Sequence, residues 1–516
     1  MRPNDPSPVM SLHQLVDRDK QPADWRLVST VLGALPFLLL AAWHWPHGPR
    51  ADFGDYAQYL LHADALLKGR PYGDIGYIYT RWAPFIGPPI EPPGLPAALV
   101  PLLALTRAAP ESPLYKGFMV LCVLGFLGAT GAYLARFGSK QIVIATLFVV
   151  GLWIETGYAT TAPQPDVIFA ALVWVMFLVV DRPGEWRWKH AVLISLLGLV
   201  ALAFRLAALP LLPAVMLYSL LRRRTVGPLA LAPMLVWCLC GTIAVAALPN
   251  AATYARFLPR DPVRLVGTFA HNAFEYPFLV LNLFLFPLPW NLGDDVYHVF
   301  ICSVAVLGAV VWIPRMRHSF PLVFTVVYLG MLFVMPIRHE RYLMPLAPMA
   351  VFFAMAGLAT VARWLARLTH HELDDTRAAR VPLGIAGLIV AVTLVREVSA
   401  PRPAALLDAP GAREVFQRLA AAHDTGVVRA VFINPRVLTW HTGVPAMGFF
   451  TAPGDSAIAE FRAKRITHVV LGDFNIDPWR SRSMASAVSA HSRAFHHLFT
   501  AGVFTVYAFD STEAAP

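Results

Sequence analysis

The sequence predicts an all-α polytopic membrane protein that ends in a small α/β domain. Of its 516 residues, 57% are hydrophobic and only 14% are charged, whereas a soluble domain carries about 25% charged residues. Apolar runs close to the roughly 20 residues that cross a bilayer as a helix recur between residues 27 and 396, separated by short basic or proline-rich loops. A water-soluble core cannot use that much apolar surface, so we expect a multi-spanning helical protein.

We expect about 11 transmembrane helices, within a range of about 10–13. The predicted spans are 27–46, 115–136, 141–158, 166–180, 189–205, 207–221, 229–248, 296–313, 319–337, 342–362 and 381–397. Residues 277–292 form a short apolar stretch that contains Pro287 and Pro289. We expect a re-entrant or interfacial segment there, because irregular backbone at membrane depth must be covered by protein or line a wet cavity.

The formal net charge of +10 comes from lysines and arginines that fall mostly at alternate ends of the apolar runs. The expected cytoplasmic segments hold more of them than the longer outer loops do. This pattern is typical of a topology signal and not of a nucleic-acid-binding patch, so no nucleic-acid partner is expected. It places the N-terminus in the cytoplasm and, with an odd number of spans, the C-terminal domain on the extracytoplasmic side of the inner (plasma) membrane.

Three regions follow from this organisation. They are a cytoplasmic leader (1–26), a transmembrane domain (27–400) whose first outer loop (47–114) contains amphipathic juxtamembrane helices, and a soluble α/β domain on the outer face (401–516). In the last region, 413–422 reads as an amphipathic helix, and 427–433, 466–471 and 503–509 read as strands. The four cysteines lie inside apolar runs and indicate neither a disulfide framework nor a zinc site.

The first outer loop is too aromatic and apolar to be a disordered linker. Its apolar residues recur at helical spacing and predict a short amphipathic helix that ends near Gly69, with Asp52 and Asp55 at its start. Two explanations of these acids are open. They can cap the helix and complement its dipole, or they can form a general-base site that activates a hydroxyl group.

Three short segments carry a family resemblance. The first is Asp55-Tyr56, followed by Ala63, Leu66-Leu67, Gly69, Pro71-Tyr72 and then Glu91-Pro92-Pro93-Gly94. The second is Thr161-Ala162-Pro163-Gln164-Pro165-Asp166, and the third is Arg338-His339-Glu340-Arg341-Tyr342-Leu343-Met344-Pro345 with Pro348 after it. In order, spacing and expected placement on the outer face, they resemble the GT-C glycosyltransferases. The likeness is to the family-39-like bacterial branch related to dolichyl-phosphate-mannose protein mannosyltransferases and lipid A aminoarabinose transferase.

The resemblance spans roughly residues 27–400 and implies a GT-C-like fold and an inverting hexosyl- or pentosyltransferase. Its donor would be a sugar on a polyprenyl phosphate, and its acceptor a hydroxyl of an envelope glycan, lipid or protein. Many members of the family have two adjacent acids in the first loop, whereas here Phe53-Gly54 separates Asp52 from Asp55. Asp55 is the favoured catalytic base because Tyr56 follows it as the family pattern requires, and Asp52 is the alternative.

Arg341 is the first candidate for stabilising the leaving phosphate, because a guanidinium can hold phosphate oxygens bidentately. The substrate-binding candidates together are Glu91, Tyr56, Asp166, Arg205, Arg338, His339, Arg341 and Tyr342. Several of these residues also have a purely structural explanation, which stays open. Arg338 and Arg341 can anchor lipid headgroups, Arg205 can sit at the interface, Glu91 can be a solvated loop residue, and Asp166 can cap its helix.

No cofactor is required by these motifs. A divalent cation, Mg²⁺ or Mn²⁺, held by Asp55 and Glu91 is an alternative, since hard cations prefer carboxylate ligands.

Two other functional classes remain open at this point: a transporter or lipid flippase, and a non-catalytic envelope-assembly protein. A transporter predicts ionisable residues near the middle of spans and an internal repeat. Here the charges gather at one face and no repeat is evident.

Overall fold

In the described part of the chain, helices predominate as far as residue 399, and a mixed sheet with its own helices follows. The computed structural model describes residues 23–46, 54–80, 82, 91–107, 109, 111–182, 186–222, 235–242, 261–281, 291–335, 338–370, 373–399, 406–452, 454–472 and 478–512. Asp52 and all of 282–290 therefore lie outside the described residues.

The helical part contains α2 (Ala23–His44), α3 (Gly54–Leu67), α4 (Gly94–Leu105), α5 (Pro113–Leu134), α6 (Lys140–Leu152), α7 (Ile154–Tyr158), α8 (Pro165–Val180), α9 (Trp188–Phe204), η3 (Leu206–Ala208), α10 (Leu211–Leu221), α13 (Pro262–Leu281), α14 (Asn291–Met316), α15 (Phe320–Val334), η6 (Glu340–Leu343), α16 (Ala347–Leu368), α17 (Asp375–Ala378) and α18 (Arg380–Ser399). Five helices of the described part are long and apolar enough to cross a membrane, and six apolar helices are shorter. The chain is thus a largely helical membrane protein with several apolar helices.

Every predicted span contains a helix, although only 235–242 of the span 229–248 is described. Two boundaries were wrong. The span 141–158 ends at Leu152, because Trp153 leaves the helical backbone with ψ 141° and α7 begins anew. The span 342–362 begins at Ala347, after a 3₁₀ turn and Pro345. The stretch expected to be re-entrant starts inside α13, so residues 277–281 are helical.

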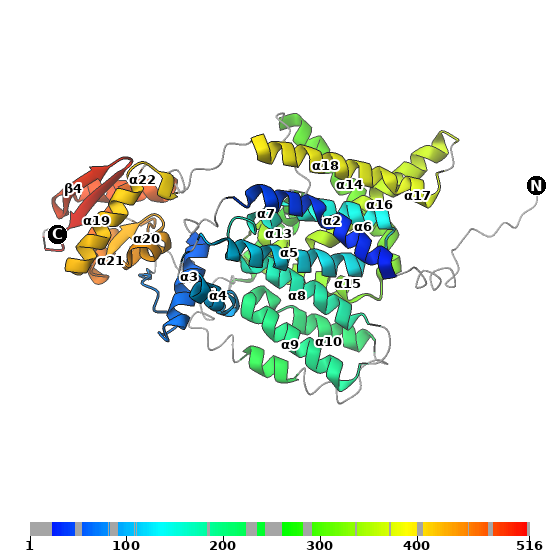
Figure 1. Cartoon of the computed structure of the whole chain (residues 1–516), viewed down its shortest axis with the longest axis horizontal. Coiled ribbons are helices and arrows are strands. Elements are labelled where there is room, and N and C mark those ends of the chain that lie inside the picture. The colour runs from blue at the N-terminus through cyan, green and yellow to red at the C-terminus, as the bar shows by residue number, and fades with distance from the viewer. Residues whose placement is uncertain are drawn as a thin grey trace, which may run out of the picture.

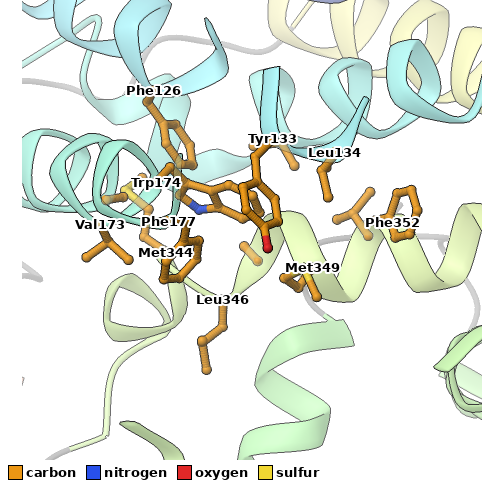
Figure 2. Close-up of a cluster of buried hydrophobic side chains, with 14 of the residues drawn as sticks. Phe126, Tyr133, Leu134, Val173, Trp174, Phe177, Met344, Leu346, Met349 and Phe352 are labelled. Carbon is orange, nitrogen blue, oxygen red and sulfur yellow. The ribbon is translucent and has the colours of Figure 1, made fainter. Parts of the chain in front are cut away.

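An aromatic core holds the helices together and extends to the turn that follows η6. Figure 2 shows Trp174 and Phe177 of α8 facing Tyr133 of α5 and Met344. The ring centroids of Tyr133 and Trp174 lie 5.7 Å apart, edge to face, an arrangement that stabilises beyond simple burial. The indole Nε1 of Trp174 donates to the carbonyl of Pro345 at 3.1 Å. The core therefore fixes the backbone just beyond η6.

The last part of the chain, residues 406–512, is called the C-terminal unit below. It contains η7 (Leu406–Asp408), α19 (Ala412–Thr425), β1 (Ala430–Phe432), α20 (Pro435–Thr442), β2 (Ala446–Gly448), α21 (Gly454–Ala463), β3 (His468–Gly472), α22 (Pro478–Ala490), η8 (Ser492–Ala494), β4 (Phe495–Ala501) and β5 (Phe504–Phe509). The strand order is β2-β1-β3-β5-β4. Strands β2, β1 and β3 are parallel, whereas β5 is antiparallel to β3 and β4. The three predicted strands and the predicted helix are present; β2 and β4 were not predicted.

The described residues of the first loop (47–114) lie between the bundle and the C-terminal unit. In Figure 1, α3 and α4 stand at the ends of the bundle helices, on the side that faces α19 to α22. The predicted amphipathic helix is α3, and Gly69 follows it in the left-handed conformation with φ 64°. Residues 76–78 pair with β2: Ile78 donates to the carbonyl of Ala446 at 2.8 Å, and Ala446 donates to that of Gly76 at 3.0 Å. The loop thus extends the sheet by one short edge segment.

A carboxylate ties three helices together at the other end of the bundle. Asp181, directly after α8, accepts hydrogen bonds from the hydroxyls of Tyr133 and Tyr218 and from the backbone N–H of Phe320, the last at 2.9 and 3.0 Å. These donors belong to α5, α10 and α15. A hydrogen bond to a charged group contributes about 1.5–3 kcal/mol, and leaving the partners unsatisfied costs a similar amount.

We predict that Asp181→Ala destabilises the folded chain by on the order of 3 kcal/mol, because it leaves two hydroxyls and one backbone N–H without their acceptor. Thermal unfolding of the purified protein in detergent measures the effect. Asp424→Ala, at an exposed position of α19, is the matched control and should leave the transition unchanged. Equal transitions for the two variants would contradict a tethering role of Asp181.

Candidate active site

Asp55 lies in the first turn of α3, with its carboxylate between two arginines. Oδ2 accepts from Nη1 of Arg341 at 3.0 Å, and Oδ1 accepts from Nη1 of Arg436 at 2.9 Å. Arg341 is in η6, and Arg436 is in the first turn of α20 of the C-terminal unit. Three distant parts of the chain therefore meet at one carboxylate.

The position of Arg341 follows from the packing of its neighbours. The hydroxyl of Tyr328 in α15 donates to the carbonyl of Tyr342 at 2.8 Å. On the other side of Arg341, the ring of His339 accepts the backbone N–H of Arg341 at 3.2 Å and so caps η6. Together with the bond from Trp174 to Pro345, these contacts place the guanidinium on a turn whose backbone is held by the bundle.

A second ion pair lies beside the first. Arg205, directly after α9, donates through Nε and Nη2 to Oδ1 of Asp166 at the start of α8, the Nε bond being 2.9 Å long. The guanidinium carbons of Arg205 and Arg341 lie 5.9 and 5.7 Å from the ring centroid of Tyr342, within the range of a cation–π interaction. The ring of Tyr342 thus connects the two ion pairs.

Glu91 reaches the same region from the loop before α4. The hydroxyl of Tyr59 donates to Oε2 of Glu91 at 3.2 Å, and that of Tyr72 donates to the Glu91 carbonyl at 2.8 Å. Gly94 allows the loop to approach the bundle, because a Cβ at this position would lie 2.6 Å from the carbonyl oxygen of Ala203. The loop therefore rests on the end of α9, next to Arg205.

The charges of these groups act on one another. Burial by itself raises the pKa of Asp55, but Arg436 and Arg341 outweigh it and bring the pKa from 3.8 to about 2. Burial and the charge of Asp55 raise the pKa of Glu91. Asp55 is therefore ionised at neutral pH, and Glu91 takes up a proton more readily than Asp55 does.

Glu155 is a further carboxyl group that the sequence analysis missed. It lies in α7, beyond the end of α6, and its side chain is 5% exposed. The imidazole Nδ1 of His339 lies 3.8 Å from Glu155 Oε1. Burial and Arg341 lower the pKa of His339, so at neutral pH this ring contributes hydrogen bonds and not charge. The sequence does contain a signal for Glu155: an acidic residue stands at the end of an apolar run. Placing a carboxyl group near membrane depth costs free energy, so such a residue is often functional.

Other predicted site residues lie elsewhere. Arg338 contacts α13, with Nη1 at 2.6 Å from His271 Nε2 and 3.8 Å from Glu275 Oε2. Tyr56 is 1% exposed, and its ring packs edge to face against Tyr115 in the apolar cluster under α3. Asp52 lies outside the described residues.

The donor set does not fit a divalent cation bound by Asp55 and Glu91. Each oxygen of Asp55 already accepts from a guanidinium, so a metal ion would have to displace a positive charge. Within the ranges that the structure describes, no three histidine, cysteine or acidic side chains come together as a metal-binding group. We derive no step through a metal ion.

Comparison with known proteins finds solved structures with a similar fold but no similar sequence. No protein-family model and no curated protein matches the sequence. Among solved structures, ArnT from Cupriavidus metallidurans bound to undecaprenyl phosphate has a TM-score of 0.53 and 14% sequence identity, over 93% of this chain and 98% of that chain. The oligosaccharyltransferase of Archaeoglobus fulgidus tethered with an acceptor peptide has a TM-score of 0.54 and 12% identity, over 95% of this chain and 74% of that chain.

This chain has the GT-C fold. Both similar proteins are GT-C family members, and each match covers more than nine-tenths of the chain. The archaeal enzyme in complex with Zn and sulfate is also similar, with a TM-score of 0.51 and 10% identity over 92% of this chain and 73% of that chain. Within the GT-C fold, the ion pairs of Asp55 and Asp166 lie where the first loop meets the ends of α8 and α9.

We predict that Glu155→Gln flattens the pH dependence of stability. Burial and the charge of Asp166 raise the pKa of Glu155 from 4.5 to about 7, against the opposing effect of Arg341. Between pH 4.5 and 7 the folded chain then binds more protons at this residue than the unfolded chain, so this group lowers the stability as the pH rises.

The midpoint of thermal unfolding in detergent, measured across this pH window, tests the prediction. The wild-type midpoint should fall more steeply with rising pH than that of the variant. Glu111→Gln, at an exposed loop position, should keep the wild-type slope. If Glu155→Gln also kept the wild-type slope, the pKa of Glu155 would not be raised in the folded chain, and the prediction would be wrong.

Proposed function

We propose that this protein is a membrane glycosyltransferase that transfers a sugar from a polyprenyl-phosphate donor to a hydroxyl group of an envelope glycan, lipid or protein. The observation that carries the proposal is the ionised Asp55, which pairs with Arg341 at one end of a helix bundle with the GT-C fold. The similarity to ArnT, whose structure contains undecaprenyl phosphate, supports a lipid-linked donor.

The reaction is an inverting displacement at the anomeric carbon. The acceptor hydroxyl oxygen forms the new bond to that carbon, and the bond from the carbon to the phosphate oxygen breaks on the opposite face. The products are a glycoside and the polyprenyl phosphate. Asp55 accepts a hydrogen bond from the hydroxyl, orients it, and takes its proton as the new bond forms.

Two physical effects fit Asp55 and Arg341 to these roles. A carboxylate with a pKa of about 2 is ionised at neutral pH but is a weak base, so its contribution while paired is mainly orientation. The leaving phosphate gains negative charge in a region of low dielectric constant, where a fixed guanidinium stabilises it more than in water. As Arg341 turns to the phosphate, Asp55 becomes more basic.

We predict that Asp55→Asn lowers the transfer rate by about 10²-fold or more, because the amide can neither accept the hydroxyl proton nor carry the charge. The assay follows undecaprenyl phosphate released from a panel of synthetic undecaprenyl-phosphate monosaccharides in proteoliposomes, with envelope extract as acceptor. Asp64→Asn is the control on the same helix, since Asp64 pairs with the nearby Lys68 and Arg70.

Each result of this assay has one meaning. Release by the wild-type protein from at least one donor, lost in Asp55→Asn and kept in Asp64→Asn, is the expected outcome. Unchanged release by Asp55→Asn would remove Asp55 from the mechanism, and loss in Asp52→Asn alone would make Asp52 the base. No release from any donor by the wild-type protein would sink the proposed function.

The proposed orientation places the site on the extracytoplasmic face of the inner membrane, with the N-terminus in the cytoplasm. We predict that Lys68→Cys, at a side chain 61% exposed, reacts with a membrane-impermeant maleimide in intact spheroplasts. The test uses a variant whose four native cysteines are replaced. Labelling only after membrane lysis would put the site in the cytoplasm and contradict the orientation.

A further inference from the structure

Arg436 is a site residue that belongs to none of the motifs described above. Its Nη1 donates to Oδ1 of Asp55 at 2.9 Å and to Oε1 of Gln58 at 2.8 Å. Its side chain is only 17% exposed, although it belongs to a helix of the C-terminal unit. The C-terminal unit therefore supplies a guanidinium to the carboxylate that the proposed mechanism uses.

The packing around Arg436 holds α20 against α3, so the backbone that carries the guanidinium is fixed. Ala57 of α3 lies in one buried cluster with Val437 and Leu438 of α20, the two residues after Arg436. Gly54 leaves room for the guanidinium, because a Cβ there would lie 2.5 Å from Arg436 Nη2. The bonds between residues 76–78 and Ala446 hold the same two parts of the chain together.

Two guanidiniums share one carboxylate at Asp55. Arg205 is paired with Asp166, which leaves Asp55 alone between Arg341 and Arg436. In the described part of the chain, the Nε atoms of Arg341 and Arg436 are also buried without a hydrogen-bond partner. Two guanidiniums that share one carboxylate and keep unused donors in a buried site favour an anion that brings several acceptor oxygens.

We propose that Arg436 is a substrate-binding residue, which together with Arg341 binds the phosphate group of the polyprenyl lipid and leaves Asp55 when that phosphate arrives. The inference rests on the proposed function and deepens it. Phosphate oxygens match the planar donor fork of a guanidinium better than one shared carboxylate does. Their arrival frees the lone pairs of Asp55 for the acceptor hydroxyl, so the carboxylate becomes a base only after the donor has bound.

Binding of undecaprenyl phosphate to the full-length protein in nanodiscs, without an acceptor, tests the proposal. Arg436→Gln should weaken the affinity by roughly ten- to hundredfold, the range expected when a hydrogen bond to a charged group is lost. Arg418→Gln, an exposed arginine of the same unit paired with Glu414, should bind as the wild type does. Undecaprenol, which lacks the phosphate, should bind wild type and Arg436→Gln equally.

A second variant separates phosphate binding from a purely structural contact. Asp55→Asn removes the carboxylate that competes for both guanidiniums, so it should tighten the binding of undecaprenyl phosphate several-fold. That gain should shrink in the double variant Asp55→Asn/Arg436→Gln. An ion pair that only docks the C-terminal unit predicts no gain in Asp55→Asn, and this result would overturn the proposal, as would equal lipid affinity of Arg436→Gln and wild type.

The binding experiment and the transfer assay test the two proposals independently. If the wild-type protein binds undecaprenyl phosphate through Arg436 but releases none from any donor, the proposed function is wrong and the phosphate-binding role of Arg436 stands. If it transfers sugar while Arg436→Gln binds the lipid normally, the function stands and the role of Arg436 is wrong.

Discussion

The pairing of one carboxylate with two guanidiniums is the interaction on which the arrangement of this molecule depends. Asp55 is 286 positions from Arg341 and 381 positions from Arg436. Burial alone would favour the protonated acid, and the two positive charges reverse that preference. A change that moves α3, η6 or α20 therefore alters the charge state of the site as well as its shape.

The bundle supplies the rigidity that such a charge arrangement requires. The turn that carries Arg341 leaves backbone carbonyls without helical partners, and Tyr328 and Trp174 donate to two of them. The donors come from α15 and α8, whose aromatic side chains pack in the same core; Figure 2 shows Trp174 and Phe177 of α8 there. Buried backbone groups must find partners, and here the partners are also the groups that position the guanidinium. Stability of the core and precision of the site have a common origin.

The sequence predicts the parts of this structure that depend on local periodicity. Apolar runs locate the helices, and the spacing of Tyr56, Tyr59 and Leu60 locates α3. Family-like motifs single out Asp55 and Arg341, which the structure brings within 3.0 Å. Their roles in catalysis stay predictions, as does the number of membrane crossings.

What could not be predicted depends on contacts between distant residues. Strand β2 has only three residues, too few for a periodic signal, and it forms beside residues 76–78 and β1. Arg436 follows Pro435 in an ordinary helix start and gains meaning only from docking on α3. Glu155 was hidden because the apolar pattern of α6 continues past the point where Trp153 turns the backbone.

The bridge between the first loop and β2 also has a consequence for how the protein is made. A ribosome that adds roughly 5–20 residues per second reaches Arg436 roughly 20–80 s after Asp55. During that interval the first loop has no strand β2 to pair with, and Asp55 lacks its ion pair with Arg436. Translation must continue past β2 before the carboxylate acquires its second cation, so a chain that stops earlier holds the bundle but an incomplete site.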